Sequence, residues 1–214
     1  MLEISFSQAN TWKTCRKQWA YRYVDGRKGI PSLPAIRGNR YHEAIETSLK
    51  MGSRPDNPIL GRAVNVIARL GWEKVEPEKY LELYDETKQY KIRGYADVVG
   101  HKEDQDFVLD WKFPGKHPGS SPKKDYVDQI QLYGYMSGFN GASLILAYPE
   151  HDTAFTVEQD FERGKSVAES IFDAARQIDE CGAKDMPGDS VDGSYNWSCR
   201  EYCSHRDICP MGGK

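Results

Sequence analysis

Two aspartates lie in neighbouring segments that both resemble β-strands. Asp97 falls in the segment 90–99 and Asp110 in the segment 107–113, and both segments are rich in apolar and aromatic residues. The polar run 100–106 between them is typical of a turn. We therefore expect a hairpin that carries one aspartate on each strand.

The pairing within this hairpin predicts a metal site. Facing residues in an antiparallel pair have position numbers with a constant total, and a turn centred between Glu103 and Asp104 gives the total of Asp97 and Asp110. Lys112 lies two residues beyond Asp110 and so returns to the same face. Two facing carboxylates repel each other unless a cation compensates them, which favours a divalent ion beside an ammonium group. The alternative is two solvated aspartates on an open sheet face.

Polar residues in two predicted helices suit such a site. Gln129 and Tyr133 lie one turn apart in the helix 123–138 and share a face. His42 would complete a nitrogen and oxygen site suited to magnesium or manganese. Core packing of Tyr133 and a structural role for His42 are the alternatives. A zincin-type metalloprotease is not expected, because Glu46 stands where its second histidine is required.

The five cysteines indicate a second metal site near the ends of the chain. Three of them cluster in the tail and need one more ligand for a tetrahedral set, which suggests an iron-sulfur cluster. Its ligands would be Cys15, Cys199, Cys203 and Cys209. Cys181 is then a spare. A zinc site with His205 in place of Cys15, or a set of unligated thiols, remains open.

The rest of the chain predicts alternating helices and strands. A capping box at Ser5 and Gln8 predicts a helix start, and Leu109, Trp111 and Phe113 should point to the face opposite the aspartates. The other predicted helices are 5–24, 38–49, 58–75 and 166–181, the other strands 81–84, 142–149 and 153–161, with a linker at 183–196 and a tail at 197–214.

Charge is distributed unevenly over the 214 residues. The formal net charge is -3, yet residues 1–40 hold eight Lys and Arg against two acids, whereas residues 150–192 hold twelve acids against four bases. This polarity is compatible with a basic groove on an acidic body. Apolar runs are far shorter than the roughly 20 residues of a membrane span and the N-terminus lacks a signal-peptide layout, so we expect a soluble, cytoplasmic protein.

Six segments together resemble the PD-(D/E)XK nuclease superfamily, and within it the RecB-like exonucleases with an iron-sulfur cluster, which include CRISPR-associated adaptation nucleases and AddB-type nucleases. The segments are SFSQANTWKTCRKQWAYRYV, GNRYHEAIE, GYADVV, LDWK, YVDQIQLYGY and CREYCSHRDICP. The resemblance implies an α/β, restriction-endonuclease-like core with a central mixed sheet flanked by helices. The tail departs from the family pattern, with three residues rather than two between Cys199 and Cys203.

The resemblance also implies roles for particular residues. Metal ligands would be His42, Asp97, Asp110 and the Trp111 carbonyl, binding Mg²⁺ or Mn²⁺. Lys112 would be the catalytic lysine, and Gln129 and Tyr133 would orient DNA or the catalytic groups. A four-iron four-sulfur cluster would join residues 1–30 to residues 197–214 as a clamp within a single nuclease domain, 1–214.

The expected substrate is DNA, single-stranded or with free ends. The basic residues Arg16, Lys17 and Arg22 would follow the phosphates, Tyr126 would contact DNA, and Trp19 with its aromatic neighbours would stack on bases or simply pack the helix. Other adaptation or recombination proteins are possible partners. A non-catalytic DNA-binding or adaptor module and a redox or iron-sensing protein are the alternatives.

Overall fold

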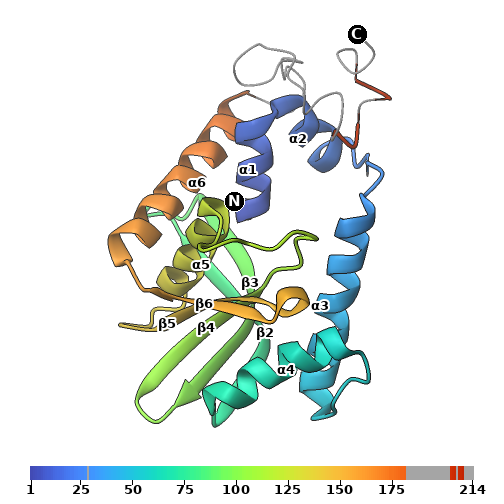
Figure 1. Ribbon diagram of the computed structural model, residues 1–214. Helices are drawn as coiled ribbons and strands as arrows, with labels where there is room; N and C mark the ends of the chain where they lie inside the picture. The colour runs from blue at the N-terminus through green and yellow to red at the C-terminus, as the bar shows by residue number, and fades with distance from the viewer. Residues whose placement is uncertain (28, 182–202, 206, 210–214) are drawn as a thin grey trace. The chain divides into compact units, whose positions relative to one another are not determined.

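The structure is a computed structural model that describes residues 1–27, 29–181, 203–205 and 207–209. Among these residues, one short strand and four consecutive helices come first, three consecutive strands follow, and the last part contains two further strands and two further α-helices (Figure 1). No helix among these residues has the length and apolar character to cross a membrane.

Two helices, and not one, follow the N-terminal strand β1 (Leu2–Ile4). The capping box is confirmed: Gln8 N–H donates to Ser5 Oγ at 3.2 Å and Ser5 N–H donates to Gln8 Oε1 at 2.7 Å. However, α1 (Phe6–Thr14) ends at Cys15, whose extended backbone (φ −160°, ψ 109°) interrupts the helical hydrogen bonds. Its Sγ accepts from Gln18 N–H at 3.4 Å and so caps α2 (Arg16–Tyr23).

Long-range packing shifts several predicted boundaries. Helix α3 (Leu33–Met51) begins before the predicted position 38. Helix α4 (Pro58–Leu70) ends earlier than predicted, because Gly71 takes a left-handed conformation (φ 65°) at its end. Strand β2 (Lys74–Tyr84) is correspondingly longer than the short strand that was expected.

The sheet is mixed and contains the predicted hairpin. Strands β3 (Tyr90–Lys102) and β4 (Gln105–Trp111) are antiparallel, and the pairing of Val98 with Leu109 confirms a turn centred between Glu103 and Asp104. The turn is much shorter than predicted because both strands continue almost to it. Strand β5 (Ser143–Tyr148) runs parallel to β4, β6 (Thr153–Glu158) antiparallel to β5, β1 parallel to β3, and β2 pairs with β3.

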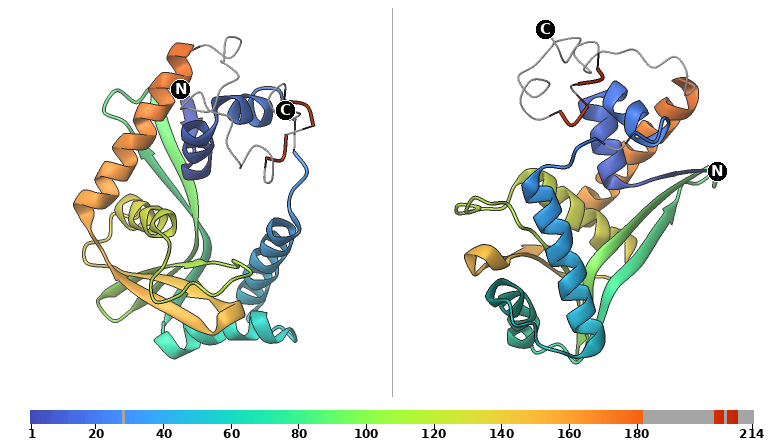
Figure 2. Two further views of the ribbon diagram at one scale, coloured as in Figure 1. Left: turned by 45° about the horizontal axis from the view of Figure 1, so that its top comes forward. Right: turned by 90° about the vertical axis from the view of Figure 1, so that its right-hand side faces the viewer.

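Helices cover both faces of the β4–β5 part of the sheet (Figures 1 and 2). On one face, Leu109, Trp111 and Ile145 pack with buried residues of α3 and α4, and Phe113 joins them. This confirms the predicted orientation of the apolar residues in β4. On the other face, α5 (Lys124–Met136) packs on β5, where Gly134 allows a close approach to Leu144.

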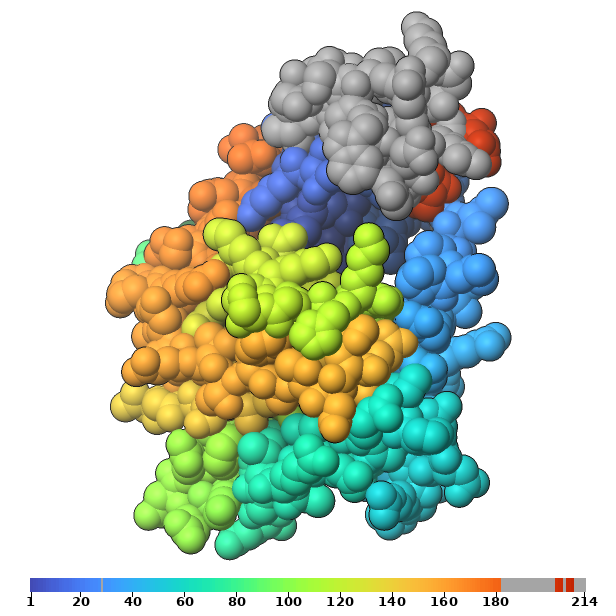
Figure 3. All heavy atoms as spheres, in the orientation of Figure 1, coloured from blue at the N-terminus to red at the C-terminus, as the bar shows by residue number. Residues whose placement is uncertain are grey.

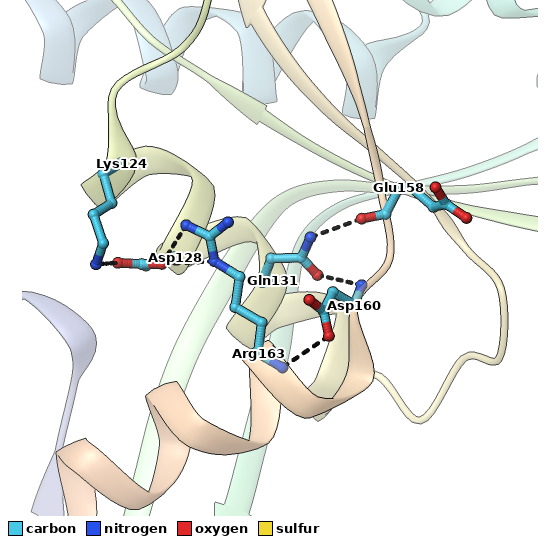
Figure 4. Close-up of polar contacts among 6 residues, drawn as sticks. All are labelled: Lys124, Asp128, Gln131, Glu158, Asp160 and Arg163. Carbon is cyan, nitrogen blue, oxygen red and sulfur yellow. Dashed lines mark hydrogen bonds and ion pairs between the residues drawn. The ribbon is translucent and has the colours of Figure 1, made fainter.

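Helix α5 is also tied to the start of the last helix, α6 (Phe161–Cys181) (Figure 4). The buried Gln131 donates from Nε2 to Glu158 O at 2.7 Å and accepts at Oε1 from Asp160 N–H at 2.8 Å. Arg163 donates from Nε and Nη2 to Asp128 Oδ1 at 2.9 and 2.7 Å. These bonds fix the register of α5 against the sheet.

The chain divides into two compact units. The first comprises the described residues of Met1–Ser32, Leu83–Arg93 and Glu169–Lys214, and the second Leu33–Glu82 and Gly94–Ala168. The hairpin aspartates and helices α3, α4 and α5 belong to the second unit, and the described cysteines to the first.

Candidate active site

Asp97 joins α3 to the hairpin. Its Oδ2 accepts the Trp111 N–H at 2.7 Å, and its Oδ1 accepts from His42 Nδ1 at 3.1 Å. Burial alone would lower the pKa of His42, but the hydrogen bond to Asp97 and the Asp97 charge outweigh burial and raise it. Residues of α3, β3 and β4 therefore converge on the Asp97 carboxylate.

Asp110 is only 4% exposed, and its charge is compensated by a single ammonium. Lys112 Nζ lies 2.5 Å from Asp110 Oδ2, which confirms that the two residues share a face. The contact is a buried ion pair, in which the ammonium offsets the charge of the carboxylate. Burial raises the pKa of Asp110 to about 6, with Lys112 opposing this effect and Asp97 adding to it.

Helix α5 holds Lys112 from the other side. Lys112 Nζ donates to Gln129 Oε1 at 2.6 Å, and Gln129 Nε2 donates to the Tyr133 hydroxyl at 3.2 Å. The same ammonium lies 4.7 Å from the centre of the Tyr126 ring. Tyr133 needs a glycine at position 94, since a Cβ there would lie 2.7 Å from its ring. Gln129 therefore orients the Lys112 ammonium, and Tyr133 holds Gln129.

The sequence analysis missed Glu78. The predicted strand began at Leu81, so position 78 was not considered, whereas β2 extends to Lys74. Burial first, then the charges of Asp97 and Glu46, raise the pKa of Glu78. Regular alternation along β2 could not have found it, because Glu78 has a left-handed backbone (φ 52°) that interrupts the pairing with β3. Asp85 N–H donates to Tyr90 O near the turn, whereas Glu73 N–H donates to His101 O at the far end, which is one residue out of step with the turn pair.

The residue types fit a hard divalent cation, since carboxylate oxygens, an imidazole nitrogen and a carbonyl are ligands that Mg²⁺ and Mn²⁺ accept. Burial keeps the pKa of Asp110 raised even beside Lys112, and a further cation would favour its charged form. In their present conformation, however, no three His, Cys, Asp or Glu side chains of the described residues surround a common point. Lys112, His42 and the Trp111 N–H satisfy the two carboxylates instead.

The loop between β4 and α5 lies on the surface beside η1 (Pro149–His151) and β6 (Figure 3). His117 of this loop packs edge-on against His151, with ring centres 5.3 Å apart. Nearby, Arg37 of α3 forms an ion pair with Glu150 at 3.0 Å. These contacts connect the loop that follows Lys112 to neighbouring elements.

In the first unit, three of the four predicted cluster cysteines are described, and Cys199 lies outside the described residues. The Tyr21 hydroxyl donates to Ile208 O at 3.4 Å. Burial first, and then the nearby thiols Cys209 and Cys15, raise the pKa of Tyr21. Cys15 and Cys209 therefore both lie near Tyr21, although they are far apart in the sequence.

His205, the alternative zinc ligand, is buried and already engaged. Its Nε2 donates to Arg27 O at 2.8 Å and its Nδ1 lies 3.1 Å from Ser204 Oγ. It also stacks on Tyr21 with ring centres 5.7 Å apart. Metal binding by His205 would require one of these contacts to break.

The residues predicted to contact DNA fall in two places. Trp19 is 8% exposed and packs edge-on against the buried Trp12, which favours the packing interpretation over stacking on bases. The guanidinium of Arg16 lies over Trp12, and the ammonium of Lys17 over Tyr21. Arg22 is exposed on α2. Tyr126 belongs to the other unit, beside Lys112.

Comparison with known proteins identifies the family. The model of the PD-(D/E)XK nuclease superfamily matches residues 3–89 and 62–210, so the chain belongs to this superfamily. No curated protein sequence matches it.

The solved structure of SSO0001 is similar, with a TM-score of 0.59 and 17% identity, covering 99% of this chain and 87% of that one. LHK-Exo in complex with dAMP is also similar, with a TM-score of 0.53 and 13% identity over 83% of this chain and 88% of that one. LHK-Exo is an alkaline exonuclease from Laribacter hongkongensis. At these identities the likeness concerns the fold.

Proposed function

We propose that this chain is a divalent-metal-dependent deoxyribonuclease that hydrolyses phosphodiester bonds, acting as an exonuclease on single-stranded DNA or DNA ends. The observation that carries the proposal is the convergence of Asp97, Asp110 and Lys112 on the β3–β4 hairpin, with His42 and Gln129 beside them. Membership of the nuclease superfamily supports it. So does the presence of dAMP, a nucleotide, in the similar LHK-Exo structure.

The residues divide the work of hydrolysis. His42, Asp97, Asp110 and the Trp111 carbonyl would hold Mg²⁺ or Mn²⁺, which when bound neutralises phosphate charge and lowers the pKa of a bound water. Lys112 is held by Gln129 and Asp110, and its ammonium would orient the attacking water and offset negative charge in the transition state. Tyr133 keeps Gln129 in place.

The test is cleavage of a labelled single-stranded oligonucleotide in manganese. Asp110→Ala and Lys112→Ala should each lower the rate at least about 100-fold, since each removes a charge that acts on the transition state. Asp104→Ala, in the exposed hairpin turn, is the matched control and should keep full activity. Undiminished cleavage by either variant would mean that the site is misassigned. Labels on the 5′ and 3′ ends report exonuclease action and its polarity.

We also propose a four-iron four-sulfur cluster bound by Cys15, Cys199, Cys203 and Cys209. Two observations in the first unit support it: Cys15 and Cys209 both lie near Tyr21, and the buried His205 already uses both ring nitrogens. The same observations make zinc with His205 the weaker candidate. The cluster would then tie the N-terminal helices to the C-terminal segment.

A second candidate function is a non-catalytic DNA-binding or adaptor subunit that works with adaptation or recombination proteins. The observation in its favour is that both hairpin carboxylates already have protein partners. It predicts DNA binding that persists in EDTA, with no cleavage in magnesium or manganese. The cleavage assay above therefore separates the two candidates.

A further inference from the structure

Two exposed tyrosines lie next to each other on β2 and β3. Tyr80 is 40% exposed and Tyr95 is 48% exposed, and their ring centres are 5.3 Å apart with the planes tilted by 57°. Both belong to the second unit. A cross-strand aromatic pair stabilises a sheet, but that role does not require nearly half of each residue to remain in contact with solvent.

The pair occupies a defined position relative to the hairpin carboxylates. Tyr80 and Tyr95 have the same position total as the turn pair Asp85 and Tyr90, so they face each other across β2 and β3. Tyr95 is two residues from Asp97, a separation of about 7 Å along a strand. The exposed pair therefore lies close to Asp97 along β3.

The surroundings of the pair favour bases over phosphates. The Tyr80 hydroxyl donates to Glu82 Oε2 at 3.1 Å, and Glu78 lies two residues away on the same strand. Carboxylates repel the phosphodiester backbone, whereas the flat rings offer surfaces for stacking. Base–aromatic stacking is tolerant of sequence and is common where proteins bind single strands.

We propose that Tyr80 and Tyr95 form a stacking platform that holds an unpaired nucleobase of a single DNA strand beside Asp97. This inference rests on the proposed function in that it places the strand at that site. The platform itself requires no metal and no chemistry. It gives the protein a preference for strands whose bases are unpaired, because paired bases have no free face to offer.

The test is binding of a fluorescent oligo-dT in EDTA, where hydrolysis does not occur. Tyr80→Ala and Tyr95→Ala should each weaken binding roughly 5- to 100-fold, the range expected for loss of one stacked base. Tyr80→Phe and Tyr95→Phe keep the ring and should bind like the unaltered protein. Tyr84→Ala is the matched control, since Tyr84 lies on the same strand with the same 40% exposure and should bind unchanged.

A second measurement uses the unaltered protein. An oligonucleotide of the same length with abasic positions throughout should bind as weakly as oligo-dT binds to the alanine variants. Equal affinity for abasic and dT strands, or alanine variants that bind normally, would overturn the platform. Thermal unfolding of each variant checks that a lost affinity does not reflect a lost fold.

Hydrolysis of bis(4-nitrophenyl) phosphate separates this inference from the proposed function, because that diester has no nucleobase. If the chain is a nuclease with this platform, the alanine variants should hydrolyse it at the unaltered rate. Absence of hydrolysis by every protein, together with base-dependent binding of oligo-dT, would overturn the nuclease proposal alone. Normal hydrolysis with base-independent binding would overturn the platform alone.

Discussion

The hairpin residues illustrate how two carboxylates are held by groups of the protein itself. Asp110 is buried, and one ammonium, from Lys112, compensates it. Asp97 is held by a backbone N–H and by His42. Burying a carboxylate lowers the stability of the folded protein. The raised pKa of Asp110 reflects this effect.

The stability of the metal-free protein should therefore depend on Asp110 and on pH. The pKa of Asp110 is raised to about 6 in the folded state, so the folded protein binds this proton more tightly than the unfolded chain. Its contribution is fully present below about pH 4 and is lost as the pH rises through 6. Asp110→Asn removes the penalty, and urea unfolding should show it more stable than the unaltered protein by up to about 3 kcal/mol at pH 8.

At pH 4 the same variant should differ little from the unaltered protein, because the carboxyl is then protonated in the folded state and about half protonated in the unfolded chain. Asp104→Asn, in the exposed turn, is the control and should have no pH-dependent effect. A difference between Asp110→Asn and the unaltered protein that is the same at pH 4 and pH 8 would contradict this account. The measurement needs EDTA throughout, so that no cation compensates the carboxylate.

Among the elements, α5 has the largest influence on the site, because it carries both Gln129 and Tyr133. Its position depends on the buried amide of Gln131, which bridges the end of β6 and the start of α6 (Figure 4). Arg163 and Lys124 add ion pairs to Asp128 at 2.7 and 2.8 Å. These pairs are partly exposed, so the amide should contribute more to stability.

Replacing Gln131 with Leu should therefore destabilise the protein. The change leaves Glu158 C=O and Asp160 N–H without their partner, at about 1–3 kcal/mol for each buried group. We expect a loss of roughly 2–4 kcal/mol in the free energy of unfolding, measured with urea. Gln105→Leu is the control, since that exposed side chain makes one bond, to Ser143 Oγ at 3.2 Å, and should change stability by less than about 0.5 kcal/mol. Equal losses in the two variants would show that the bridge is not important.

Over the whole molecule, the first unit brings together residues from both ends of the chain. His205 binds the backbone of Arg27, and Tyr21 binds the backbone of Ile208. Cys15 lies at the break between α1 and α2, where an extended residue presents its thiol at a helix start. Each of these contacts is a single hydrogen bond or a helix cap. A cluster bound by cysteines of both segments would join the segments more strongly.

Anaerobically purified protein should therefore absorb at about 400 nm, the region of iron-sulfur charge transfer. Cys15→Ser should remove most of this absorbance and of the bound iron, because it deletes one of four ligands. Cys181→Ser is the matched control and should keep both, since Cys181 ends α6 and is not a proposed ligand. Zinc in place of iron, or full absorbance in Cys15→Ser, would contradict the cluster.

Local patterns in the sequence determined a large part of this protein. The capping box at Ser5, the turn centre between Glu103 and Asp104, and the shared face of Asp110 and Lys112 all follow from short-range geometry, and all are confirmed. Alternation along a strand and the spacing along a helix need no knowledge of the rest of the fold. The hairpin part of the candidate site was predictable for this reason.

Only the tertiary structure decided the remainder. Burial of Trp19 against Trp12, the helix break at Cys15 and the extension of β2 to Glu78 are features that appear only once the elements are packed together. An aromatic residue in a basic helix has the same local pattern whether it packs or stacks on a base, and a strand start is set by its pairing partner rather than by its own residues. Long-range packing therefore determines which side chains meet at the site and which remain on the surface.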